Sequence, residues 1–145
     1  MFRKLSIALL SVACITVLGS FDVHPQSPPR SSSGGAATRL SLVQAFICED
    51  IKDGIPTNPA VAFPISTAKI YCYTLFDQIV EDTVVYHQWF FRDKPSARIK
   101  LSIKQPRWST YSSIQLREAD KGPWRVEISD AGGRVLKTLR FSLTD

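Results

Sequence analysis

The stretch VVYHQWFFRDKPSARIKLSIK, residues 84–104, decides the fold. Its second part, Ala97–Lys104, places an apolar residue at every other position and basic or hydroxyl residues between them, and Val85–Phe91 repeats with the same period. A period of two sends successive side chains to opposite faces of a β-strand. Asp93-Lys94-Pro95 between the two parts is a turn sequence. The stretch therefore predicts two antiparallel strands, each half-buried.

The same period recurs from Leu40 to Asp145, where no segment has a convincing helical period over ten or more residues. The alternation predicts seven strands, at residues 41–51, 67–76, 83–92, 96–104, 108–116, 124–129 and 134–143. Seven short antiparallel strands in about 100 residues are typical of an immunoglobulin-like or fibronectin-like β-sandwich, which often buries a Trp where Trp89 stands. Lys137 shares the parity of apolar neighbours, so we expect a bulge or a change of face in the last strand.

The first 39 residues have a different composition. Arg3 and Lys4 precede an apolar run from Leu5 to Leu18, which is the pattern of a secretory signal peptide. Retention as a membrane anchor is the alternative, although a spanning helix needs about 17 to 25 apolar residues. Residues 21–39 are rich in Pro, Ser and Gly and predict a flexible linker. We therefore expect a signal segment at 1–20, a linker at 21–39 and an extracytoplasmic, periplasmic β-sandwich domain at 40–145.

The net charge gives little support to a nucleic-acid-binding protein. The chain has 18 Lys and Arg against 13 Asp and Glu, a net charge of +5. Arg3 and Lys4 belong to the signal segment, and their removal leaves +3. A nucleic-acid-binding domain usually has a stronger basic footprint and meets its partner in the cytoplasm.

Two cysteines, Cys48 and Cys72, lie on the first two predicted strands. Exported proteins commonly pair their cysteines. A hairpin centred near Ala60 would place the two opposite one another, so we expect a disulfide that stabilises the domain by roughly 3 to 4 kcal/mol. Two buried free thiols are the alternative.

Five short blocks of the sequence resemble, in the same order, those of a bacterial family called domain of unknown function 2914. They are Glu49-Asp50 with Ile55-Pro56, Val85–Trp89, Arg107–Ser113, Gly122–Glu127, and Gly133–Leu136 with Phe141. The resemblance implies a small all-β extracytoplasmic module, often carried behind a membrane segment, with no established activity. It transfers no catalytic residue, and the two cysteines are not part of the family's pattern.

The domain has few groups suited to catalysis. His87 is its only histidine, and it is either a general base or pH-sensitive contact, or a histidine hydrogen-bonded inside the sandwich. One histidine and a cysteine pair do not make a zinc site, and the sequence has no nucleophile elbow and no phosphate-binding glycine loop. We therefore expect no enzyme, no metal and no cofactor, with a hydrolase as a distant alternative.

A binding surface is better supported. Six basic residues and one acid lie between Arg92 and Arg107. The residues proposed to bind are Arg98, Lys100 and Lys104 on the outward face of one strand, followed by Arg107, Trp108 and Tyr111. Cations beside aromatic rings suit a protein partner or an anionic or polysaccharide component of the cell envelope. Lysines on an edge strand also prevent edge-to-edge pairing. The alternative is a carbohydrate-binding module that stacks sugar rings on the exposed Trp or Tyr.

Overall fold

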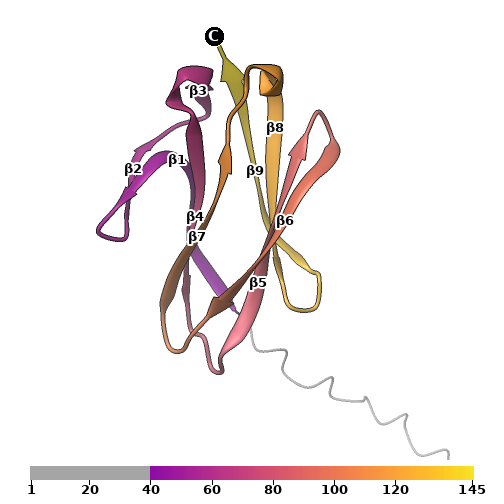
Figure 1. The fold of residues 1–145 in the computed structure, drawn as a ribbon. Coiled ribbons are helices and arrows are strands. Elements are labelled where there is room, and N and C mark those ends of the chain that lie inside the picture. The colour runs from indigo at the N-terminus through magenta and orange to yellow at the C-terminus, as the bar shows by residue number, and fades with distance from the viewer. Residues whose placement is uncertain (1–39) are drawn as a thin grey trace, which may run out of the picture. The chain divides into compact units, whose positions relative to one another are not determined.

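The computed structural model describes residues 40–145, so the predicted signal segment and linker lie outside the described part. Strands make up most of it (Figure 1). The elements, in order, are β1 (Ser41–Lys52), β2 (Ile55–Pro59), β3 (Ala62–Pro64), η1 (Ile65–Thr67), β4 (Lys69–Asp77), β5 (Thr83–Phe91), β6 (Lys94–Ile103), β7 (Trp108–Gln115), η2 (Glu118–Asp120), β8 (Gly122–Asp130) and β9 (Val135–Thr144). No helix within residues 40–145 has the length and apolar character needed to span a membrane.

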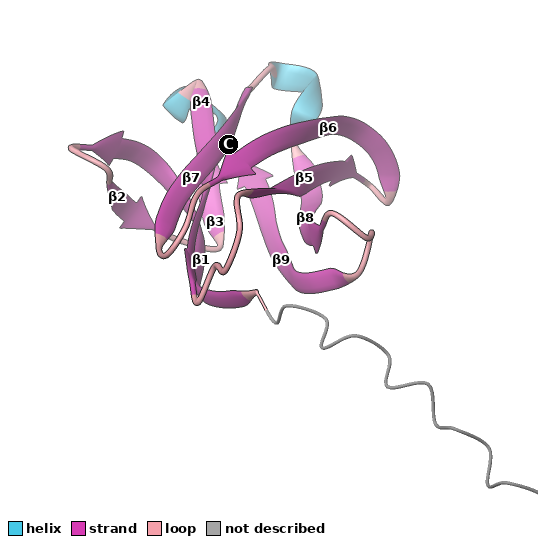
Figure 2. Ribbon diagram, turned by 90° about the horizontal axis from the view of Figure 1, so that it is seen from below, coloured by secondary structure: helices cyan, strands magenta, loops and turns pink. Residues whose placement is uncertain are grey.

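The strands form two sheets packed face to face, which confirms the predicted all-β sandwich (Figure 1). One sheet has four strands in the order β2-β1-β4-β7, and the other has five in the order β3-β9-β8-β5-β6. All strand pairs are antiparallel except β3 with β9. The 3-10 turns η1 and η2 lie at one end of the sandwich (Figure 1 and Figure 2).

The sequence predicts seven of the nine strands and misses β2 and β3. Both fall in the connection that contains Pro56, Pro59 and Pro64. Proline cannot donate to a strand ladder, so it argues against a central strand but is tolerated at a sheet edge. The structure places β2 and β3 at edges, one in each sheet. This segment therefore leaves one sheet and joins the other.

The expected irregularity in the last strand is present. Ile128 lies opposite Lys137, whereas Ser129 lies opposite Val135, so Leu136 is an extra residue in β9. A bulge of this kind changes the face on which the following residues lie. Lys137 consequently takes the inward parity of the buried Ile128 opposite it.

Polar side chains meet at the centre of the otherwise apolar core. His87 and Trp89 of β5 are fully buried and face Thr74 of β4 and Ser112 of β7, across the sandwich. His87 Nδ1 lies 2.8 Å from Ser112 Oγ, and His87 Nε2 lies 3.3 Å from Thr74 Oγ1. Trp89 Nε1 donates to Ser112 Oγ at 3.1 Å, and Thr74 Oγ1 donates to the carbonyl oxygen of Thr110 at 3.2 Å. We call these groups the core hydrogen-bond chain.

The proton positions in this chain follow from its two ends. The indole nitrogen of Trp89 only donates, so Ser112 Oγ accepts from it and has its own proton free for His87 Nδ1. Thr74 has given its proton to a carbonyl, so it accepts from His87 Nε2. His87 is therefore the neutral Nε2–H tautomer. No buried side-chain nitrogen or oxygen in the described domain lacks a partner.

The predicted disulfide is absent, because Cys48 and Cys72 are free and buried. In the antiparallel pair of β1 and β4, Cys48 lies opposite Tyr71 and Cys72 lies opposite Ile47. The pairing is one residue away from the register that a turn centred at Ala60 would give. A shift of one residue sends a side chain to the other face of a sheet. The two thiols therefore point to opposite faces, where no bridge can form.

Burial lowers the pKa of His87 to about 4, from an ordinary value of about 6.5. Protonation of His87 then favours the unfolded chain. The contribution of neutral His87 to stability is therefore complete above about pH 6.5 and falls as the pH drops toward 4. The shift corresponds to about 3 kcal/mol. We expect urea unfolding between pH 7 and pH 4 to show this loss. His87→Asn is the control: it should be less stable at pH 7 but should have a flatter profile between pH 7 and 5. Equal slopes would contradict this role for His87.

Both free thiols should resist alkylation in the native protein. Burial raises the pKa of Cys48 to about 11 and also raises the pKa of Cys72, so little thiolate forms at pH 8. We expect iodoacetamide to label both residues in urea without any reductant, and neither residue in the folded protein. Peptide mapping measures each site separately. If labelling in urea requires a reductant, the cysteines are oxidised and this prediction is wrong.

Candidate functional site

The outward side of the five-stranded sheet combines cations with aromatic rings. His87 and Trp89 point inward from β5, so Tyr86 and Phe90 point outward. Tyr86 lies opposite Lys100 of β6, and its neighbour Gln88 lies opposite Arg98. On the other side, Phe90 lies opposite Arg125 of β8, which lies opposite Arg140 of β9. We call these outward side chains the basic face: Tyr86, Phe90, Arg98, Lys100, Arg125 and Arg140.

Two arginines of the basic face are held against rings. The guanidinium carbon of Arg98 lies 4.3 Å from the ring centroid of Tyr86, and that of Arg125 lies 3.8 Å from that of Phe90. Such stacking orders an arginine and leaves its N–H groups available for a ligand. Arg125 is already neutralised by ion pairs with Asp93 and with Glu127, the latter at 3.1 Å.

The other cations of the basic face are free to meet a ligand. Among residues 40–145, Arg98, Lys100 and Arg140 have no ion pair. Glu127 is the acidic residue in the cross-strand rows that contain these cations, and its carboxylate is paired with Arg125. The basic face thus presents uncompensated positive charge on one sheet surface.

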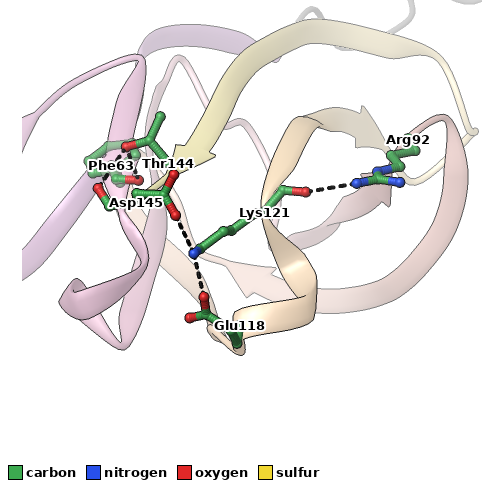
Figure 3. A network of polar contacts seen from close by, with 6 residues as sticks. All are labelled: Phe63, Arg92, Glu118, Lys121, Thr144 and Asp145. Atoms are coloured by element: carbon green, nitrogen blue, oxygen red, sulfur yellow. Dashed lines mark hydrogen bonds and ion pairs between the residues drawn. The ribbon is translucent and has the colours of Figure 1, made fainter.

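Lys121 and Arg92 are held in a separate polar network (Figure 3). The ammonium group of Lys121 lies between the carboxylates of Glu118 and Asp145, and Arg92 Nη2 donates to the carbonyl oxygen of Lys121 at 3.2 Å. Hydrogen bonds with Asp145 and Glu118 raise the pKa of Lys121, and the hydrogen bond with Lys121 lowers the pKa of Asp145. This cluster fastens the end of β9 to η2 and does not extend the basic face.

The structure separates the six residues that the sequence groups as one site. Arg98 and Lys100 are exposed on the outward side of β6, as predicted. β6 ends at Ile103, so Lys104 lies in the connection to β7, with its ammonium nitrogen 5.7 Å from the ring centroid of Trp108. Arg107, beside it, is paired with Asp77 at 2.9 Å.

Trp108 and Tyr111 do not form a common platform. Trp108 lies opposite Phe76, whose side chain is in the core, whereas Tyr111 lies opposite Tyr73 on the outward side. An interval of three residues along a strand reverses the face. The two rings are 38% and 49% exposed, but they lie on opposite sides of β7. A single ligand therefore cannot stack on both from the same sheet surface.

Tyr111 belongs instead to an aromatic cluster on the outward side of the four-stranded sheet. Phe46 of β1, Tyr73 of β4 and Tyr111 of β7 lie side by side in register. Tyr71 packs edge-on against Tyr111 with ring centroids 5.8 Å apart, and the ammonium nitrogen of Lys69 lies 4.9 Å from the Tyr71 centroid. We call Phe46, Tyr71, Tyr73 and Tyr111 the aromatic face.

His87, the candidate base, has both ring nitrogens engaged in the core hydrogen-bond chain and no exposed surface. In the part of the chain that the structure describes, no three His, Cys, Asp or Glu side chains come together as metal ligands. His87 thus has a structural position in the core, and the accessible polar groups lie on the sheet surfaces.

Sequence reasoning missed Arg125, Arg140 and the two aromatic rings of the basic face. The outward parity of Tyr86 and Phe90 is visible in the sequence, because they alternate with His87 and Trp89. Their proximity to the arginines of β8 and β9 depends on which strands are neighbours, and the periodicity of one strand does not contain that information.

Comparison with known proteins supports the family indicated by the sequence blocks. The model of a family described as "Protein of unknown function (DUF2914)" matches residues 82–143, which run from the start of β5 almost to the end of β9. The first block, around Glu49 and Ile55, lies outside the match. Comparison with curated proteins finds no match. Residues 82–143 of the chain are thus similar to the DUF2914 family, in agreement with the resemblance of the sequence blocks.

Proposed function

We propose that this domain is a non-catalytic extracytoplasmic binding module that docks an acidic partner protein on the basic face. The observation that carries the proposal is the group of cations without ion pairs in the described domain, Arg98, Lys100 and Arg140, on one sheet surface. A partner with carboxylates at matching positions gains charge-assisted hydrogen bonds there. The location outside the cytoplasm rests on the signal-like sequence at 1–20.

The chemistry of the basic face favours recognition of an acidic surface. Arg98 is ordered by Tyr86 before any partner arrives, so less side-chain entropy is lost on binding. Exposed ion pairs contribute only about 0.2 to 1 kcal/mol each, so the cations must act together. Binding of this kind is fast and weakens at high salt, because mobile ions screen charges beyond about 10 Å at 0.1 M.

The proposal assigns no catalytic residue and no cofactor. Its support is the position of His87, whose ring is enclosed and hydrogen-bonded on both sides. A histidine base must reach a substrate proton through a hydrogen bond or one water. A hydrolase that uses this histidine would therefore need the two sheets to separate.

Carbohydrate binding is the second candidate, and the aromatic face supports it. Tyr111 is 49% exposed and is held by Tyr71, which gives it a fixed ring surface. The hydroxyl groups of Ser109 and Ser113 share the outward parity of Tyr111 on β7. A ring flanked by hydroxyl groups suits an uncharged sugar, in contrast to the basic face.

Removal of two cations from the basic face should weaken partner capture. A photo-crosslinking residue at Ser102, outward on β6, should capture an acidic protein in the native cell envelope. Arg98→Ser with Lys100→Ser should reduce that capture about fivefold, since two exposed ion pairs supply about 1 kcal/mol. Mass spectrometry identifies and quantifies the captured protein.

The matched control is Lys52→Ser with Lys69→Ser, which removes the same charge from the other sheet and should leave capture unchanged. A crosslinking residue at Ser109, outward on β7, controls for position. Equal capture from Ser102 and Ser109, or undiminished capture by the Arg98 and Lys100 variant, would refute docking on the basic face.

Loss of the exposed tyrosine ring should weaken any carbohydrate binding. Stacking on an aromatic ring contributes about 1 kcal/mol, so Tyr111→Ala should weaken polysaccharide binding about fivefold. Affinity electrophoresis measures this as a smaller retardation of the protein in gels that contain soluble polysaccharide. Trp108→Ala is the matched control, because that ring lies on the other side of β7. Retardation that depends on Trp108 and not on Tyr111 would count against the aromatic face.

A further inference from the structure

A groove opens between the two sheets along the side where β1 faces β9. One part of it, of about 410 Å³, is lined mainly by Ala45, Ile47, Val61 and Leu139. A second part, of about 250 Å³, continues along β1 from Leu42 to Phe46 and is bounded by Lys137. Val61 and Val43 are among the most exposed large apolar residues of the described domain. The groove is thus apolar and open to solvent, and the small residue Ala45 lines both of its parts.

The edge of β1 beside this groove has unpaired backbone groups. β2 pairs with β1 only from Cys48 to Lys52, and Ala60 N–H donates to the carbonyl oxygen of Ile47 at 3.1 Å. Backbone groups alternate in direction along a strand, so those of Ala45 point the same way as those of Ile47. The register of β2 would place Ala62 opposite Ala45, but Ala62 begins β3 in the other sheet. Nothing in the described domain occupies that strand position.

The facing edge of β9 is also open. β3 pairs with β9 only from Ser142 to Thr144, and Ser142 N–H donates to the carbonyl oxygen of Val61 at 3.0 Å. The preceding part of β9, from Val135 to Phe141, has no neighbouring strand on that side within residues 40–145. The free part of β1, residues 41–46, spans about 20 Å, which is the length of an ordinary strand.

The charge at the groove selects among possible occupants. Lys137 and Arg140 line it, no acidic residue does, and neither cation has an ion pair within the described domain. Residues 1–39 have four basic residues and one acid, so they do not complement these cations. The edge strand β6 of a second copy would bring Arg98 and Lys100 and would be repelled. An acidic segment fits.

We propose that the groove takes an extended peptide of a partner protein, in which apolar residues alternate with acidic ones, and that the peptide adds to β1 as a further strand. Its backbone pairs with Ala45, its apolar side chains enter the groove toward Leu139 and Val61, and its carboxylates reach Lys137 and Arg140. Strand addition gives affinity through main-chain hydrogen bonds and specificity through alternate side chains. This site shares Arg140 with the basic face and uses neither Arg98 nor Lys100.

The test uses the full chain and a short fluorescent peptide in which valine and glutamate alternate, with a valine–lysine peptide as the matched probe. We expect the glutamate peptide to bind at least tenfold more tightly in an anisotropy titration, and to slow hydrogen exchange of the Ala45 amide measured by NMR. Lys137→Glu should reverse the preference. Ala45→Pro removes the donor on the open edge and should abolish binding of both peptides, with circular dichroism as the folding control.

Other outcomes would overturn the proposal. These are equal binding of both peptides, protection that maps to β6 instead of β1, or concentration-dependent self-association that Lys137→Glu removes, which would assign the groove to a second copy. Protection of the Ala45 amide without any added peptide would assign it to the chain's own residues 1–39. Arg98→Ser with Lys100→Ser should leave peptide binding unchanged, so that failure of this site and failure of the basic face are distinguishable.

Discussion

The core hydrogen-bond chain is the constraint on which the arrangement of the two sheets depends. Apolar side chains alone tolerate some sliding of one sheet over another, whereas a buried polar group left without a partner costs about 1 to 3 kcal/mol. His87 of one sheet must reach Thr74 and Ser112 of the other at the same time. Only one relative position of β4, β5 and β7 satisfies all of these groups, so the chain specifies the packing as well as stabilising it.

Fixing the inward residues also fixes the outward ones. With His87 and Trp89 inside, Tyr86 and Phe90 must lie outside, and the ladder then sets which cations surround them. The alternation in the sequence predicts this division within each strand, including the exposure of Arg98 and Lys100. It does not predict that Arg125 lies beside Phe90, because that contact joins strands far apart in the chain. The separation of Trp108 from Tyr111 could have been predicted from the sequence, since residues an odd number of positions apart lie on opposite faces of a strand.

The cysteines and the missed strands share one cause. The connection between β1 and β4 is not a simple loop, because its proline-rich part forms β2 and β3. Pairing register in a hairpin is set by turn geometry, and a long connection with strands of its own removes that constraint. The actual register is one residue away from the expected one, which is enough to put Cys48 and Cys72 on opposite faces. Sequence proximity of two strands therefore predicted their pairing but not their register.

The crossing of this segment from one sheet to the other also creates the groove. Because β2 leaves β1 at Pro59 and β3 joins β9 only at Ser142, each sheet keeps an unpaired stretch on the same side of the sandwich. Lys137 reaches that side because the bulge at Leu136 turns it inward. A buried position would not tolerate an unpaired lysine, so its place at an open edge resolves the anomaly in the alternation. Local departures from a regular pattern often mark functional positions, and here the departure puts a cation beside free backbone groups.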